Sequence, residues 1–370
     1  MSFSSQPSYL GVDIGASATK IVELANEGKR PRLVTYGIVE EPLNLVGTVD
    51  PRQEPARVGA ALRALVAKSR VTTTKAFASL PTFSVFTSII NIPQVAGKDL
   101  AAAVRWEAKK IVPLPIDDMV LDWKPLVEAG VGKSAVLANV EKDGGTGTRI
   151  LLTAAAKDLV KKYIEVFRAA GLQLMSLETE AFALIRSLVG PEDGVVMVVD
   201  VGAVNTDISV VDHGIPFLNR SIDTGGLVIT KTLSESMAVT LDEAEQMKRD
   251  LGNNIAEGSQ GVPEALQAVV EPIVNELSYC VSLYERQRQA LEKTTATPLS
   301  GSPAISKVIM TGGCSALAGL TDHLSKRLNI RVISVNPWSR IMVPKELEPE
   351  LATFGSRLSI AIGLAMRDIV

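Results

Sequence analysis

Two short segments of the chain carry the same acidic turn, and that turn is suited to binding phosphate. Residues 12–24 read VDIGASATKIVEL, and residues 199–211 read VDVGAVNTDISVV. Each is typical of a β-hairpin with a glycine close to an aspartate. A glycine lets the backbone approach phosphate oxygens, and a carboxylate beside it can hold Mg²⁺ through coordinated water. A single copy is common in ordinary hairpins, but two matched copies predict two related lobes that share one ligand, with Asp13 and Asp200 as metal residues.

A third candidate element is the sequence Thr311-Gly312-Gly313. A predicted strand (305–312) leads through these glycines into a predicted helix (316–328). The glycine pair would leave the N-terminus of that helix open to a base, ribose or phosphate. Strand-glycine-helix turns are frequent, so this element is informative only in combination with the two hairpins.

Composition limits the classes of function. The chain has 370 residues, 46% of them hydrophobic, which fits two packed domains. A net charge of −3, 4% aromatic residues and no dense Lys/Arg cluster argue against a nucleic-acid surface. No secretory signal or spanning apolar run is visible, so we expect a cytoplasmic protein in which Cys280 and Cys314 are reduced thiols. We expect His213 and His323, too few for a histidine metal site, to lie at the surface.

Hydrophobic periodicity and turn residues predict alternating strands and helices. Thr240 and Glu243 have the spacing of a helix capping box. We expect exposed loops at 128–149 and 294–304 and a buried apolar C-terminal helix. Predicted strands cover 8–14, 19–25, 32–40, 75–93, 118–128 and 149–156, and predicted helices cover 54–69, 99–112, 157–170, 178–189, 225–237, 241–251, 263–291 and 316–328.

Together the three elements resemble the two phosphate motifs and the adenosine motif of actin-like ATPases. The resemblance implies an α/β actin-like ATPase (ribonuclease H-like) two-lobed fold that binds ATP and Mg²⁺ in the crevice between its lobes. Lys20 matches the phosphate-contacting lysine, and Gly225, Gly226, Glu245 and Lys248 match positions near the phosphates, ribose or adenine. An exposed i,i+3 ion pair is the alternative for Glu245 and Lys248. The implied nucleotide-binding residues are Gly15, Ala16, Ser17, Ala18, Lys20, Gly202, Ala203, Asn205, Thr206, Gly225, Gly226, Glu245, Lys248, Gly312, Gly313 and Ser315.

Within that superfamily the segment 103–126, AVRWEAKKIVPLPIDDMVLDWKPL, resembles the PilM family of type IV pilus assembly proteins. The resemblance runs over nearly the whole chain. It implies an insertion subdomain like that of the cell-division protein FtsA. The implied division is lobe 1 at 1–192 plus 349–370, with the insertion at about 82–155, and lobe 2 at 193–348, with a subdomain at about 225–305.

The resemblance to this family implies a scaffold role in pilus assembly and twitching motility. The implied partners are the N-terminal cytoplasmic peptide of the inner-membrane protein PilN and components of the pilus motor or platform. Association with the membrane would be peripheral, without direct insertion, and homo-oligomerisation is left open. Trp106 and Trp123 are candidate anchors for a peptide. The alternative, a core helix, accounts for Val104 and Ile111 but not for the two tryptophans.

Hydrolysis would require a side chain that orients water. Comparison with actin places Glu180 there, but an acidic residue in the first turn of a helix is also favoured by the helix dipole. We therefore expect ATP binding with slow or partner-dependent turnover. A small-molecule kinase and an FtsA-like filament protein bound to lipid are the alternative functions, and a chaperone is less well supported. The sequence at 130–134 is similar to a Walker A loop but has Val127 where that motif needs glycine.

Overall fold

The structure, a computed structural model, describes most of the chain. Most of the predicted loop 128–149, including the Walker-like sequence, and most of the predicted loop 294–304 lie outside the described residues. No helix in the described part is both long enough and apolar enough to cross a membrane. The described residues are 6–41, 55–93, 95, 97–126, 147–253, 262, 264–294, 304–315, 317 and 319–370.

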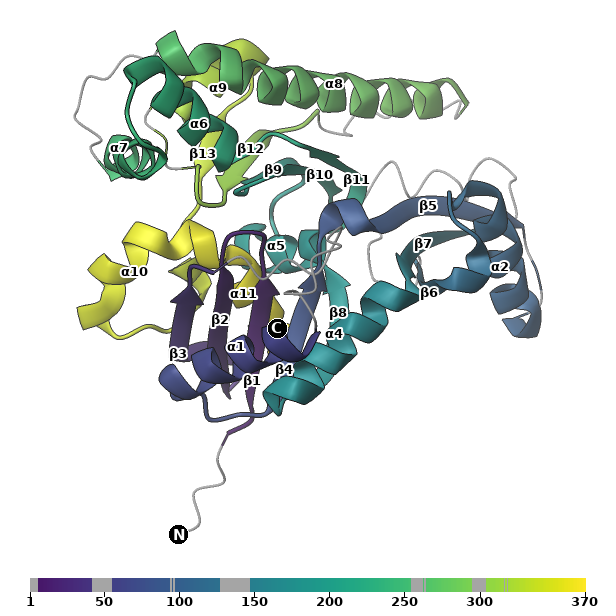
Figure 1. Cartoon of the computed structure of the whole chain (residues 1–370). Coiled ribbons are helices and arrows are strands. Elements are labelled where there is room, and N and C mark those ends of the chain that lie inside the picture. The colour runs from purple at the N-terminus through teal and green to yellow at the C-terminus, as the bar shows by residue number, and fades with distance from the viewer. Residues whose placement is uncertain are drawn as a thin grey trace.

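Two five-stranded sheets share one topology (Figure 1). In each, three antiparallel strands are followed by two parallel ones, so the repeat seen in the hairpins extends to the whole sheet. The first sheet has the order β3-β2-β1-β4-β8, with β1 (Ser8–Ile14), β2 (Thr19–Glu27), β3 (Arg30–Val39), β4 (Lys75–Leu80) and β8 (Gln173–Thr179). The second has the order β11-β10-β9-β12-β13, with β9 (Val195–Val201), β10 (Thr206–Asp212), β11 (Ile215–Ile222), β12 (Lys307–Thr311) and β13 (Val332–Ser334).

Helices cover both faces of each sheet. Two of them pack on the outer face of the first sheet, namely α1 (Pro55–Lys68) and α4 (Lys157–Ala170). The outer face of the second sheet packs against α6 (Gly226–Met237), α7 (Leu241–Asn253), α8 (Glu264–Thr294) and α9 (Leu320–Leu328). Between the sheets lie α5 (Glu180–Leu188) and α11 (Ser359–Ala365), and the chain reaches α11 through η5 (Pro337–Arg340), η6 (Lys345–Leu347), α10 (Glu348–Phe354) and η7 (Gly355–Leu358).

Strand β9 shows why this layering follows from the sequence. Its residues are apolar almost throughout, and successive side chains of a strand point to opposite faces. Val195, Met197 and Val199 pack under α6 and α8. Val196 and Val198 pack against α5 and α11 in the core between the sheets. A strand buried on both faces therefore has a continuous apolar sequence.

The insertion between β4 and α4 forms a separate small sheet beside the first one (Figure 1). Its order is β5-β7-β6, and helix α2 packs on it. The prediction of a core helix is right for Val104, which is 1% exposed, but wrong for Ile111, which is 37% exposed. Trp106 is 67% exposed, whereas Trp123 packs onto the core of this sheet. The elements are η2 (Thr82–Ser84), β5 (Val85–Pro93), η3 (Gly97–Asp99), α2 (Leu100–Ile111), η4 (Ile116–Asp118), β6 (Met119–Pro125) and β7 (Gly147–Ala156).

Several sequence predictions need correction. The helix predicted at 316–328 begins only at Leu320, after Gly319 in a left-handed conformation. The helix predicted at 178–189 begins at Glu180 because β8, which was not predicted, extends through Thr179. His213 and His323, which were predicted to lie at the surface, are both half-buried, and His213 pairs with Asp212.

The predicted capping box is confirmed. The backbone N–H of Thr240 donates to the Glu243 carboxylate, and the backbone N–H of Glu243 donates to the Thr240 hydroxyl oxygen. Both cysteines are free and buried.

Two glycines allow α11 to approach its neighbours closely. A Cβ on Gly11 of β1 would lie 1.9 Å from the Ala361 carbonyl oxygen of α11. A Cβ on Gly363 of α11 would lie 1.9 Å from the Ala183 carbonyl oxygen of α5. Both contacts are with backbone, so the neighbour cannot give way by rotating a side chain. The separation between the two sheets therefore depends on these glycines.

We predict that Gly363→Ala lowers the free energy of unfolding by about 1–3 kcal/mol, because the added methyl group overpacks the α5–α11 contact. The matched control is Gly97→Ala, where a Cβ meets no atom within 4 Å. Urea denaturation of both variants checks the prediction. Equal stability of the two variants would contradict it.

Candidate functional site

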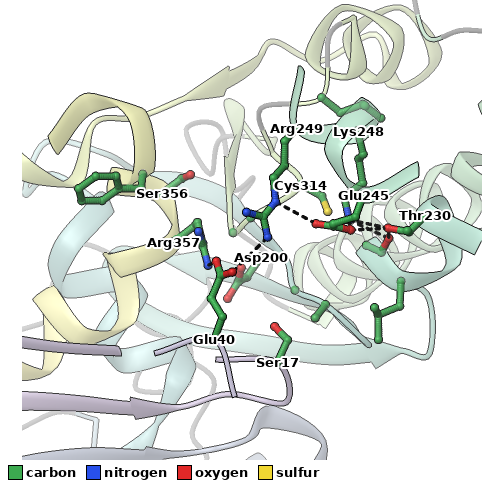
Figure 2. A pocket seen from close by; sticks show the side chains of 18 of the residues that line it. Ser17, Glu40, Asp200, Thr230, Glu245, Lys248, Arg249, Cys314, Ser356 and Arg357 are labelled. Carbon is green, nitrogen blue, oxygen red and sulfur yellow. Dashed lines mark hydrogen bonds and ion pairs between the residues drawn. The ribbon is translucent and has the colours of Figure 1, made fainter. Parts of the chain in front are cut away.

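One cavity of about 920 Å³ lies where the turns of the two hairpins face each other, among the residues that the structure describes. Its walls come from both sheets, from α6 and α7 and from the segment before α11 (Figure 2). This volume is within the range of small-molecule and cofactor sites. Of the predicted site residues, Asp13, Ser17, Lys20, Asp200, Gly202, Ala203, Gly226, Glu245, Lys248, Gly312 and Gly313 line it.

The first hairpin contributes an ion pair. Asp13 lies opposite Lys20 in the β1–β2 register, and Lys20 Nζ donates to Asp13 Oδ2 at 2.8 Å. Burial would lower the pKa of Lys20, but the charge and hydrogen bond of Asp13 and the charge of Asp200 outweigh it and raise that pKa. Lys20 is thus a charged donor held in place at the cavity wall, as a phosphate contact requires.

The second hairpin has a carboxylate where the first has that lysine. Asp207 lies opposite Asp200 in the β9–β10 register, as Lys20 lies opposite Asp13. Burial, and then the charge of Asp207, raise the pKa of Asp200 to about 7. Burial also raises the pKa of Asp207 to about 6. Sequence analysis missed Asp207, although a position-by-position alignment of the two repeats places it at the position that Lys20 has in the first hairpin.

Glu180 lies beside this acidic group and does not line the cavity. Its Oε2 accepts hydrogen bonds from the backbone N–H and the hydroxyl of Thr82, at 2.8 and 2.9 Å. Burial, followed by the charges of Asp207 and Asp13, raises its pKa well above the ordinary range. The carboxyl group of Glu180 therefore belongs electrostatically to the cluster around Asp200, and its role as the water-orienting residue stays a prediction.

Helix α6 is fixed on the second turn by its first residues. Gly226 N–H donates to the Gly202 carbonyl oxygen and Leu227 N–H donates to the Ala203 carbonyl oxygen, both at 2.9 Å. A Cβ on Gly225 would lie 2.6 Å from that same oxygen of Ala203. The backbone N–H groups of Gly226 and Leu227 are thus already bonded within the protein. Gly225 and Gly226 therefore serve to bring α6 close to the second turn.

Lys248 and Glu245 are an i,i+3 ion pair, with Nζ to Oε2 at 2.6 Å. Lys248 Nζ also donates to Thr230 Oγ1 at 2.8 Å and to the Gly226 carbonyl oxygen at 3.1 Å. An ammonium group has three donors, and all three have partners on α6 and α7. Both side chains line the cavity, and in this arrangement they hold α6 and α7 together.

The glycines after β12 form a turn, so the predicted helix N-terminus at this site is wrong. Gly312 has φ of +90°, and a Cβ there would lie 2.2 Å from Asp200 Oδ1. This left-handed residue lets the chain reverse next to the carboxylate. Ser315 Oγ donates to the Gly312 carbonyl oxygen at 2.8 Å and fixes the turn. A Cβ on Gly313 would meet nothing closer than Arg357 Cγ at 3.9 Å.

The remaining predicted residues shape the turns and do not line the cavity. Gly15 N–H donates to the Ala18 carbonyl oxygen at 3.0 Å, and Gly202 N–H donates to the Asn205 carbonyl oxygen at 2.9 Å, so the two turns close in the same way. Thr206 Oγ1 donates to the Thr224 carbonyl oxygen. The predicted residues outside the lining are Gly15, Ala16, Ala18, Asn205, Thr206, Gly225, Ser315 and Glu180.

Sequence analysis missed two further sets of lining residues. One is polar and consists of Glu40, Arg249 and Arg357, which come from three distant segments and form ion pairs with one another. The other set is apolar and consists of Leu227, Leu241, Leu317, Phe354 and Ile360. No local pattern distinguishes these residues from ordinary helix and loop positions.

The residues present fit a nucleotide with Mg²⁺. The two turns, Lys20 and two aspartates lie at one end of a cavity that also has apolar walls. Within the described residues, no three His, Cys, Asp or Glu side chains are grouped closely enough to hold a metal ion directly. Mg²⁺ keeps several of its own waters and needs only one or two carboxylates. Asp13 and Asp200 suit that mode of binding.

Comparison with known proteins gives the family. The sequence profile described as type IV pilus assembly protein PilM matches residues 11–369. The chain belongs to this family. A solved structure of a PilM-PilN type IV pilus biogenesis complex matches with a TM-score of 0.77 and 26% identity over 98% of each chain.

More distant relatives agree with the predicted superfamily. FtsA of Neisseria meningitidis is 25% identical over 278 residues, which cover 69% of this chain and 61% of that protein's length. FtsA of Enterococcus hirae is 22% identical, with 95% of this chain and 82% of FtsA covered. The ethanolamine utilization protein EutJ of Carboxydothermus hydrogenoformans has the same fold, with a TM-score of 0.52, 18% identity and coverage of 97% and 89%. The predicted actin-like ATPase fold is confirmed, whereas the predicted lobe boundaries stay a prediction.

We predict that Asp200→Asn stabilises the protein at high pH when no nucleotide is added. The pKa of Asp200 is about 7 in the folded chain and has its ordinary, lower value in the unfolded chain. Between these two pKa values the folded chain binds more protons than the unfolded chain, so the free energy of unfolding falls as the pH rises through this range. The substitution should raise the free energy of unfolding by on the order of 1–3 kcal/mol near pH 8 and have little effect near pH 4. Urea titrations at both pH values measure this, and a destabilised variant near pH 8 would be the contrary result.

Proposed function

We propose that this protein binds Mg-ATP between its two sheets and acts as a nucleotide-responsive scaffold of type IV pilus assembly. The observation that carries the nucleotide site is that both hairpin turns, with Asp13, Lys20 and Asp200, line one cavity. Two matched turns on the same ligand are what an ancestral duplication of a phosphate-binding hairpin would produce.

Each side chain has a distinct part in the proposed site. Lys20, held by Asp13, would contact phosphate oxygens, and the carboxylates of Asp13 and Asp200 would bind waters of the Mg²⁺ ion. Bound Mg²⁺ would supply positive charge against both the phosphates and the acidic cluster. The apolar walls would take the base. Because Glu180, the candidate for orienting water, does not line the cavity, we infer slow turnover, in which ATP serves as a switch that favours one arrangement of the lobes.

The nucleotide site is tested by calorimetric titration of Mg-ATP into Asp13→Ala, Asp200→Ala and the unsubstituted protein. We expect binding in the unsubstituted protein and a loss of roughly tenfold or more in both variants, since hydrogen bonds and ion contacts with charged groups are removed. Asp200→Asn separates binding from folding, because it should be stable and still bind poorly. Unchanged affinity in all variants would refute the assignment.

The partner proposal is supported by the match to a solved PilM-PilN complex, which covers 98% of this chain and 98% of the matched chain. The proposed ligand is the short N-terminal peptide of that inner-membrane protein. This contact would hold the protein at the membrane from the cytoplasmic side and link it to motor or platform components. The insertion with its exposed Trp106 is a candidate anchor, since a large aromatic side chain at 67% exposure suits a peptide contact.

The partner proposal predicts that a synthetic N-terminal peptide of a PilN-type protein binds this chain in fluorescence anisotropy. The affinity should change severalfold when Mg-ATP is added, because ATP biases the lobes toward one arrangement. A scrambled peptide of the same composition is the control. Equal binding of both peptides would contradict the proposal.

A further inference from the structure

Three charged side chains from separate segments meet at the cavity (Figure 2). Glu40 follows β3 of the first sheet, Arg249 lies on α7 and Arg357 on η7. Arg357 Nη2 lies 2.7 Å from Glu40 Oε1, and Arg249 Nη2 lies 3.3 Å from Glu40 Oε2. Both oxygens of one carboxylate are thus held by two guanidinium groups. Glu40 connects the first sheet to a helix that covers the second.

The two arginines also lie next to the groups assigned to the nucleotide. Arg357 is the nearest neighbour to the position of a Cβ on Gly313, and its charge acts on Lys20. Arg249 Nε donates to Glu245 Oε1 at 3.3 Å. Arg357 therefore lies near Lys20, the predicted phosphate contact, and Arg249 contacts Glu245.

A carboxylate between two guanidinium groups marks a place where an anion is bound well, since arginine recognises phosphate and carboxylate oxygens through the same donors. The hydrogen bond from Arg357 lowers the pKa of Glu40, so its carboxylate is charged at neutral pH. About half of the Glu40 and Arg249 side chains and 30% of Arg357 are exposed. Such exposed ion pairs add little stability, so a more highly charged anion can replace the carboxylate.

We propose that Arg249 and Arg357 form an anion subsite for a phosphate group of the nucleotide, and that Glu40 competes with that phosphate for both guanidinium groups. This inference rests on the ATP site proposed above. In this arrangement the Glu40 carboxylate competes with the phosphate inside the cavity. When the phosphate binds, Glu40 is released, and the Glu40–Arg249 ion pair that joins the end of β3 to α7 is lost. The nucleotide then changes a contact between the two halves of the molecule directly.

The test compares Glu40→Gln with Glu41→Gln. Glu41 is the matched control because it adjoins Glu40, is similarly exposed, pairs with Arg57 at 3.1 Å and does not line the cavity. Both substitutions change the net charge equally. Calorimetric titrations use two probes, Mg-ATP and inorganic tripolyphosphate, and adenosine serves as the ligand without phosphate.

We expect Glu40→Gln to bind Mg-ATP and tripolyphosphate about two- to thirtyfold more tightly than Glu41→Gln, as loss of two competing exposed ion pairs implies. Adenosine should bind both variants alike. Arg357→Gln and Arg249→Gln should weaken both phosphate probes, and adding Arg357→Gln to Glu40→Gln should remove the gain. If Glu40→Gln binds the phosphate probes no better than Glu41→Gln, or binds neither, the subsite is refuted.

The two proposals fail differently. If Mg-ATP binds the unsubstituted protein but the two glutamine variants do not differ, the ATP site stands and the competition by Glu40 is wrong. If Mg-ATP does not bind but tripolyphosphate follows the expected order of affinities, the anion subsite stands and the proposed ATP function is wrong. Weaker binding of Mg-ATP by Glu40→Gln would instead make Glu40 a ligand contact and overturn the competition.

Discussion

The packing of both sheets against the same two helices, α5 and α11, is the constraint on which the rest of the structure depends. The core between the sheets includes Val196, Val198 and Ile309 of the second sheet, Phe77 of the first, and apolar side chains of both helices. Because Gly11 and Gly363 let backbones touch, this core is thin and its geometry is narrowly defined. The two hairpin turns are consequently held on opposite walls of one cavity.

Within that frame the two repeats have diverged in charge. The same register position holds Lys20 opposite Asp13 in one hairpin and Asp207 opposite Asp200 in the other. The first hairpin thus has an internally compensated ion pair, and the second has neighbouring carboxyl groups whose pKa values are raised to about 7 and about 6. Two neighbouring carboxyl groups with raised pKa values reduce stability when both are charged, and the proposed Mg²⁺ ion would offset their repulsion. In the proposed site, the same asymmetry would supply a cationic donor for phosphate and an acidic place for Mg²⁺.

The sequence predicted the fold well where local signals are strong. The hairpins, the capping box at Thr240 and the helices α1, α4 and α8 have clear periodicity or turn residues. Strand β8 was missed because the half-polar sequence QLMSLET owes its pairing to β4, which is distant in sequence. Strand β11, which pairs with the adjacent strand β10, was missed as well. The start of α9 was misplaced by four residues because the glycines at 312 and 313 were interpreted as leading directly into a helix at 316, whereas Gly312 takes a left-handed turn and α9 begins at Leu320.

The part of the candidate site that lies in the two repeated hairpins could be predicted from the sequence. Asp13, Asp200 and the turn glycines follow from the duplicated segment, and Asp207 follows from the same alignment. Lys20 follows from the resemblance to actin-like ATPases. Glu40, Arg249 and Arg357 do not, because their ion pairs join residues 209 and 317 positions apart and no spacing rule connects them. Contacts of that kind arise from how the lobes pack and can be recognised only once the fold is known.

The most direct test of the central claim is an experimental structure with Mg²⁺ and a non-hydrolysable ATP analogue. The account predicts that the phosphates lie between the turns that begin at Gly15 and Gly202, with the metal ion and its waters next to Asp13 and Asp200. A nucleotide bound elsewhere, or phosphates in contact with only one of the two turns, would contradict it.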